Sequence, residues 1–174
     1  MKIKNKMFGV IIAGGRGTRF WPISRKKRPK QLLNIFGDQS MLQMTIDRLR
    51  KIRFIEDIYI ATGKDLAKSI AQEVEGISKK NIIVEPSGKN TAPSIGLVAG
   101  HLLNRDPEAV MGIFPADHLI VGHRPFYQSL SAALDLVSKN KILVTLGIIP
   151  SSPHTGYGYI QYNKKKILKD GIAF

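Results

Sequence analysis

The 174-residue chain contains no cysteine, and this absence excludes several classes of protein. A disulfide scaffold, a thiolate zinc site, an iron–sulfur cluster and a cysteine nucleophile all require that residue. Long apolar runs are lacking too, because no stretch reaches the roughly 18 residues that a membrane-spanning helix needs. We therefore expect a cytoplasmic protein without a membrane partner.

Acidic residues are scarce, 13 against 27 lysines and arginines, so the formal charge is +14 with histidine neutral. Such an excess suits nucleic acid, an anionic membrane surface, or small substrates that carry several phosphates. A nucleic-acid partner is disfavoured, because aromatic and basic residues do not interleave and no reader motif is present. Hydrophobic residues form 43% of the chain, so a folded core is expected and global disorder is excluded.

Strand-type and helix-type segments alternate along the sequence. Residues 8–13 form an unbroken apolar run, which is typical of a strand covered on both faces. Further strands are predicted at residues 57–61, 81–84, 110–114, 141–147 and 157–162. Helices are predicted at residues 40–52 with Ser40 as N-cap, 66–74, 91–103 with Thr91 as N-cap, and 124–139. This alternation indicates an α/β fold with a mostly parallel sheet, in which ligands bind at the carboxyl ends of the strands.

A glycine-rich, basic segment follows the first predicted strand. Gly14, Gly15 and Gly17 allow sharp backbone turns that bring several N–H groups to one anion, and Arg19 and Lys30 add fixed positive charge. The spacing matches neither a Walker A loop nor the dinucleotide GxGxxG pattern. The segment favours a nucleotide phosphate site, with a tight turn beside a solvated basic surface as the alternative.

Three further polar segments follow later strands. Asn90 offers both a donor and an acceptor to a base edge or hydroxyl, unless the segment is an ordinary helix start. Asp117 follows a central strand, where a carboxylate can hold Mg²⁺ against substrate phosphates, or can instead cap the next turn. Gly156 and Gly158 allow a sugar to approach the backbone, and the neighbouring tyrosines can instead serve strand packing.

Taken in order, four motifs carry a resemblance to a known family. GGRGTRFWPISRKKRPKQ, EPSGKNTAP, FPADH and GIIPSSPHTGYGYI resemble the motifs of the bacterial mannose-1-phosphate guanylyltransferases, from Phe8 to Gln161. The resemblance implies a Rossmann-like three-layer nucleotidyltransferase fold that joins GTP and mannose 1-phosphate, with Mg²⁺, to give GDP-mannose and pyrophosphate. The sugar phosphate oxygen is already anionic, so in-line attack on the α-phosphorus needs positioning and charge neutralisation more than a general base.

The resemblance also implies roles for individual residues. The triphosphate would be cradled by Gly14, Gly15, Gly17, Thr18 and Arg19. Arg19 and Lys30 would be catalytic, with Lys30 stabilising charge near the α-phosphate. Glu85 and Asn90 would bind the nucleotide, Gly156 and Gly158 would line the mannose pocket, and Asp117 would bind Mg²⁺.

Two departures from the family pattern bear on function. Lys89 stands where the family usually has arginine, so a bidentate contact there would become a point charge. The family also continues past the position of Phe174 into further sugar and metal contacts. We therefore expect residues 1–174 to form one C-terminally incomplete nucleotidyltransferase domain, as a homo-oligomer or with a partner chain that supplies the rest. The alternative function is a nucleotide-binding fragment or one subunit of a split enzyme.

Overall fold

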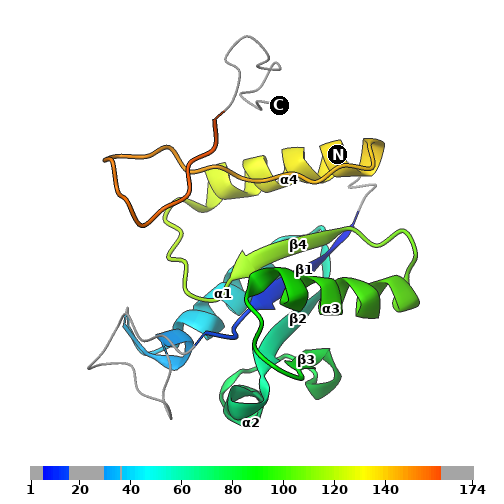
Figure 1. Cartoon of the computed structure of the whole chain (residues 1–174), viewed down its shortest axis with the longest axis vertical. Helices are drawn as coiled ribbons and strands as arrows, with labels where there is room; N and C mark the ends of the chain where they lie inside the picture. Colours follow the sequence, from blue (N-terminus) through cyan, green and yellow to red (C-terminus); the bar gives the residue numbers. More distant parts are fainter. Residues whose placement is uncertain (1–5, 16–29, 36, 162–174) are drawn as a thin grey trace. The chain divides into compact units, whose positions relative to one another are not determined.

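The computed structural model describes residues 6–15, 30–35 and 37–161 (Figure 1). The chain divides into two compact units, Met1–Ile142 and Leu143–Phe174. Within the described residues, no helix is long and apolar enough to cross a bilayer. Among the described residues, the regular helices and strands all belong to the first unit.

Four strands of the first unit form one parallel sheet. They are Met7–Ile12 (β1), Ile55–Gly63 (β2), Ile82–Glu85 (β3) and Met111–Pro115 (β4). The spatial order is β3-β2-β1-β4, and each adjacent pair is parallel. The chain therefore winds outward in one direction from β1 to β3 and then resumes on the other side of β1. Open α/β sheets bind ligands at the carboxyl ends of the strands where the order reverses, here between β1 and β4, and this place is called the β1–β4 crevice below.

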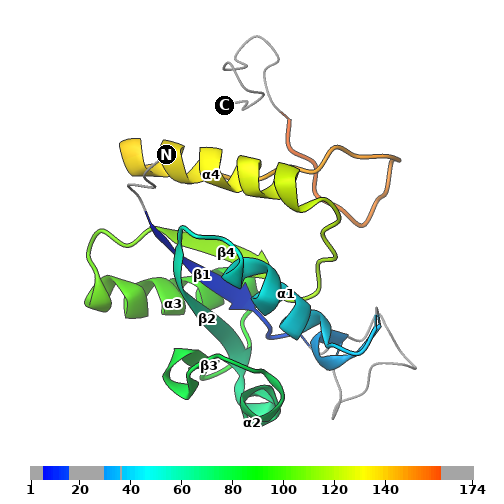
Figure 2. The ribbon, with the colours of Figure 1, turned by 180° about the vertical axis from the view of Figure 1, so that it is seen from behind.

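Four helices cover the two faces of this sheet (Figures 1 and 2). They are Met41–Arg50 (α1), Lys64–Glu73 (α2), Thr91–Arg105 (α3) and His123–Lys139 (α4). Ile11 of β1 belongs to the hydrophobic cluster that contains the buried side chains of α1, α2 and α4. Val10, the preceding residue, packs in a second cluster with Val98 and Leu102 of α3. Because successive side chains point to opposite faces, an unbroken apolar run in β1 supplies both clusters.

The start of α1 follows directly from its sequence. The Ser40 hydroxyl accepts a hydrogen bond from the Gln43 backbone N–H at 3.2 Å, which satisfies one donor of the first turn. Leu42, Ile46 and Leu49 then recur on one face and are completely buried. The predicted N-cap of α1 is confirmed.

The start of α3 differs from the prediction, because the N-cap is Asn90 and not Thr91. Asn90 has φ +68° and ψ −171°, a strained backbone conformation, outside the αL region, that residues other than glycine rarely adopt. Its side chain makes no capping hydrogen bond, so the backbone conformation, rather than a hydroxyl cap, defines the helix start.

Two predicted strands are absent from the described part of the chain. Residues 141–147 and 157–161 have no strand assignment, although the first four strands and all four helices are confirmed within about two residues at each end. Within the first of these segments, the side chains of Leu143 and Leu146 are exposed. An apolar run has the composition of a buried strand, but a strand also needs a neighbouring edge for its backbone N–H and C=O groups. Composition cannot specify that neighbour.

Candidate active site

The turn after β1 forms the centre of the candidate site. The Ala13 N–H donates to the Ala61 carbonyl at 2.8 Å, which extends the β1–β2 pairing by one residue. The buried Gln31 amide donates to the carbonyls of Ala13 at 2.8 Å and Gly15 at 3.1 Å. The Thr62 hydroxyl also donates to the Ala13 carbonyl, at 3.2 Å. Side chains from two other segments therefore fix the backbone of this turn.

Gln31 is a site residue that the sequence analysis missed. It lies in a short 3-10 helix, Lys30–Leu32 (η2), directly after Lys30. Gln31 is the last residue of the motif GGRGTRFWPISRKKRPKQ, but the motif assigned it no role, and a single glutamine has no periodic signal. A usable signal was its place beside the predicted catalytic lysine, since groups that orient a site are often its sequence neighbours.

Glu85 and Gly14, both predicted to bind nucleotide, lie in contact. Glu85 ends β3 and is only 7% exposed. A Cβ added to Gly14 would lie 2.9 Å from Glu85 Oε1, so that position accepts no side chain unless the carboxylate moves. The Ser94 hydroxyl of α3 donates to the same oxygen at 3.1 Å. The structure thus joins the carboxyl ends of β1 and β3 with the first turn of α3.

Lys30 and Asp117, 87 positions apart, form an ion pair. The Lys30 ammonium donates to Asp117 Oδ2 at 2.8 Å. The Ala116 N–H donates to the Ile12 carbonyl at 3.1 Å, so the residues after β4 stay beside the turn that follows β1. The predicted catalytic lysine and the predicted metal ligand therefore meet at the β1–β4 crevice. Both side chains remain partly exposed, as groups that meet a ligand must be.

The other predicted nucleotide residues lie partly within and partly outside the described residues. Asn90 and Lys89 lie on the exposed loop after β3, and within the described residues Asn90 is not hydrogen-bonded to Glu85. Gly17, Thr18 and Arg19 lie outside the described residues, so their roles remain predictions.

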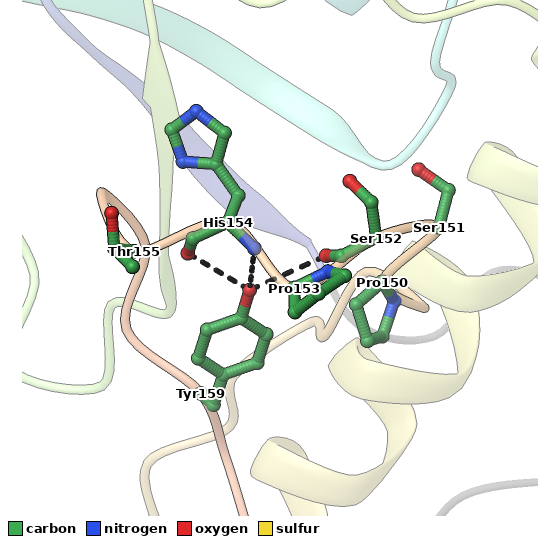
Figure 3. A pocket seen from close by; sticks show the side chains of 7 residues that line it. All are labelled: Pro150, Ser151, Ser152, Pro153, His154, Thr155 and Tyr159. Carbon is green, nitrogen blue, oxygen red and sulfur yellow. Dashed lines mark hydrogen bonds between the residues drawn. The ribbon is translucent and has the colours of Figure 1, made fainter.

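The second unit contains a shallow pocket of about 470 Å³, lined by Pro150–Thr155 and Tyr159 (Figure 3). The Tyr159 hydroxyl accepts from the His154 N–H at 2.7 Å and is 2.9 Å from the His154 carbonyl, to which it donates. The Gly156 N–H donates to His154 Nδ1 at 3.1 Å. A Cβ on Gly156 would meet the His154 ring at 2.9 Å, whereas one on Gly158 would meet nothing within 4 Å. The close approach at Gly156 thus has a local packing reason.

The parallel sheet and the reversal of its strand order beside β1 are features of nucleotide-binding α/β proteins. Residues 8–170 match the model of the nucleotidyl transferase family, and the chain belongs to that family. This finding confirms the family resemblance and the α/β nucleotidyltransferase fold that the motifs predicted.

Three similar proteins indicate the branch of the family. The chain is 41% identical over 154 residues to a mannose-1-phosphate guanylyltransferase of Klebsiella pneumoniae, covering 87% of this chain and 32% of that protein. It is 36% identical over 169 residues to the alginate biosynthesis protein AlgA of Pseudomonas aeruginosa, covering 96% and 35%. A solved structure described as a mannose-1-phosphate geranyltransferase from Thermus thermophilus superimposes with a TM-score of 0.67 at 29% identity, over 77% of this chain and 39% of that one. The chain spans about a third of the length of the curated relatives it matches.

Proposed function

We propose that this chain is the nucleotide-binding part of a mannose-1-phosphate guanylyltransferase, which joins GTP and mannose 1-phosphate to give GDP-mannose and pyrophosphate. One observation carries the proposal: the Lys30–Asp117 ion pair lies at the crevice beside the glycine turn that follows β1. The guanylyltransferases among its relatives support the choice of reaction. The cytoplasm is the proposed compartment.

The glycine turn is proposed to receive the triphosphate. A polyphosphate is bound well by several backbone N–H groups that face one anion. The Gln31 amide donates hydrogen bonds to the carbonyl oxygens of Ala13 and Gly15. These two negative dipole ends therefore do not face the phosphates. Gly17, Thr18 and Arg19 are proposed to complete this cradle, on the basis of the motif alone.

Glu85 is proposed to select guanine, with Asn90 as a second contact to the nucleotide. An ionised carboxylate only accepts hydrogen bonds. Guanine carries an exocyclic amino donor next to its ring N–H, whereas the same edge of adenine has no such pair of donors. The contacts of Glu85 with Gly14 and Ser94 keep the carboxylate at this end of the sheet.

Mg²⁺ is the proposed cofactor, and the Asp117 carboxylate is the described group that fits it. The described residues contain no cluster of three or more histidine, aspartate or glutamate side chains that would form a complete protein cage. Mg²⁺ does not need one, because it keeps several waters and takes one or two carboxylates together with substrate phosphates. The partly exposed Asp117 carboxylate would hold the ion, which would supply charge neutralisation at the phosphates.

The chain's own residues have defined tasks in the proposed reaction. The anionic oxygen of mannose 1-phosphate forms a bond to the α-phosphorus of GTP, while the bond from that phosphorus to the β-phosphate oxygen breaks and pyrophosphate leaves. Lys30 and Arg19 neutralise charge on the α-phosphate during this displacement. Gly156 and Gly158 are proposed to line the mannose site. GTP and mannose 1-phosphate are the proposed substrates, and a second copy or another chain is the proposed macromolecular partner.

Pyrophosphate release by the 174-residue chain tests the proposal. The assay contains GTP, mannose 1-phosphate and Mg²⁺, with Lys30→Ala as the test variant and Lys68→Ala, at an exposed position of α2, as the matched control. Release that requires mannose 1-phosphate and is lost only in Lys30→Ala would support the transferase. GTP binding without release would favour the nucleotide-binding fragment. A folded chain that neither binds GTP nor releases pyrophosphate would contradict both.

A further inference from the structure

A buried arginine on α1, Arg48, contacts the residue that follows the predicted metal ligand Asp117. Arg48 is only 8% exposed, although it carries a full positive charge. Its Nη2 donates to the Thr45 hydroxyl at 3.0 Å and its Nη1 to the His118 carbonyl at 3.3 Å. The guanidinium carbon lies 5.8 Å from the centre of the Phe126 ring of α4. One planar group therefore joins α1, the turn after β4 and α4.

Stability alone gives a poor account of this residue. Its Nε has no hydrogen-bond partner in the described residues, and none of their carboxylates pairs with the guanidinium. Burial without a counter-charge lowers the pKa of the Arg48 guanidinium, which reflects the cost of removing a cation from water. An apolar side chain of similar volume in such a place is often as stable or more stable. The presence of a buried arginine at position 48 therefore needs a reason other than stability.

That reason lies in the group that Arg48 binds. His118 directly follows Asp117, and residues 118–122 have no regular secondary structure. The Ala116 N–H holds the segment to β1 on one side of Asp117. The bond from Arg48 to the His118 carbonyl holds it on the other side. The carboxylate that meets Lys30 is thus anchored at both neighbours.

We propose that Arg48 is a positioning residue, which fixes the His118 carbonyl so that the Asp117 carboxylate stays at the β1–β4 crevice. This inference rests on the proposed function for the role of Asp117, and on the structure for the anchor. Outer groups that orient metal ligands typically change metal affinity or activity by about 10–100-fold when removed. A lysine at position 48 would keep the charge but would lose the planar fork that reaches Thr45 and His118 together.

The test compares Arg48→Met and Arg48→Lys in the full 174-residue chain. Arg50→Met is the matched control, because Arg50 lies on the same helix, is exposed, and donates to the Gly76 carbonyl away from the crevice. The first readout is amide hydrogen exchange at Ala116, whose N–H donates to the Ile12 carbonyl next to Asp117, measured without ligand. The second is Mn²⁺ affinity by electron paramagnetic resonance. The third is the kcat and KM of pyrophosphate release.

For Arg48→Met, we expect exchange at the Ala116 amide to be faster by about tenfold, with the amides of β1 and β2 unchanged. Mn²⁺ affinity and kcat should each fall about tenfold, while the KM for GTP changes by less than about twofold. Arg48→Lys should be intermediate in all three, and Arg50→Met should match the unmodified chain. If Arg48→Met does not fold, the same three measurements on Arg48→Lys and on the unmodified chain test the inference.

A folded Arg48→Met chain with unchanged exchange at the Ala116 amide would overturn the inference, as would unchanged Mn²⁺ affinity in a chain that binds Mn²⁺. Failure of the proposed function is a distinct result. In that case the unmodified chain would bind no Mn²⁺ and release no pyrophosphate, and the exchange measurement would still decide whether Arg48 anchors the turn.

Discussion

Replacing Lys30 by methionine removes the ammonium group but keeps most of the side-chain volume. That ammonium lies 2.8 Å from Asp117 Oδ2, and the two side chains are 21% and 39% exposed. Because water screens such a pair, its net contribution to folding is small, and we expect the free energy of unfolding to fall by about 1 kcal/mol. For a chain of this size, that change lowers Tm by about 2–4 °C.

The expected loss of nucleotidyl transfer is much larger. A group aimed at charge that develops in the transition state typically contributes about 3 kcal/mol. Its removal corresponds to a fall in kcat of about 100-fold. The barrier would therefore rise by about three times the loss in folding stability, so partial unfolding could not account for the slower reaction.

The affinity for a divalent cation, by contrast, should increase in Lys30→Met. Without nucleotide, Lys30 occupies the carboxylate oxygen that a divalent cation would need. Removing a competitor worth about 1 kcal/mol should tighten the binding of Mn²⁺ alone by about fivefold. A substitution that slows transfer while tightening metal binding would separate competition at Asp117 from general damage to the site.

Urea unfolding, pyrophosphate release and Mn²⁺ titration on the same preparations check these three values. Lys68→Met, on the exposed side of α2, is the control and should match the unmodified chain throughout. Transfer at the normal rate by Lys30→Met would refute the reasoning. Weaker Mn²⁺ binding would refute the competition, because it would mean that Lys30 supports the metal site instead of opposing it.

Gly14→Ala should weaken GTP binding about tenfold with little change in Tm, because the new methyl group displaces the Glu85 carboxylate; a normal dissociation constant by calorimetry would contradict this. Gln31→Leu should lower the free energy of unfolding by about 1–3 kcal/mol in urea, because the Gly15 carbonyl loses the Gln31 amide and the Ala13 carbonyl keeps only the Thr62 hydroxyl as a donor. An unfolding curve like that of the unmodified chain would mean that water replaces the amide at no cost. Tyr159→Phe should speed amide exchange at His154 by about fivefold, since a bond to the phenol oxygen is lost, and equal rates would dismiss that bond.

Much of the sheet could be predicted because its strands carry strong local patterns. The apolar run of β1 matches a strand that packs on both faces, and both faces are indeed covered. Ser40 predicted the start of α1 because its hydroxyl caps the helix without help from distant residues. At residues 141–147 the same kind of apolar pattern led to a wrong prediction, since pairing depends on a neighbour that no local pattern encodes.

In the site, too, some residues could be predicted from the sequence and others could not. That Asp117 would meet the basic segment followed from topology, because the carboxyl ends of parallel strands share one edge of a sheet, and the ion pair with Lys30 agrees with that expectation. Gln31 and Arg48 could not be found in this way. One resembles a loop residue and the other an ordinary polar residue on a helix, and their importance lies in backbone carbonyls far along the chain.

The clamp formed by Gln31 has a consequence for how the family can vary. The Gln31 side chain binds the carbonyls of Ala13 and Gly15. A contact outside the connecting residues 16–29 therefore holds the neighbouring Lys30 beside the glycine turn. The placement of Lys30 beside the turn should therefore survive changes among residues 20–29, which carry none of the proposed phosphate contacts, provided that the glutamine beside the lysine is kept.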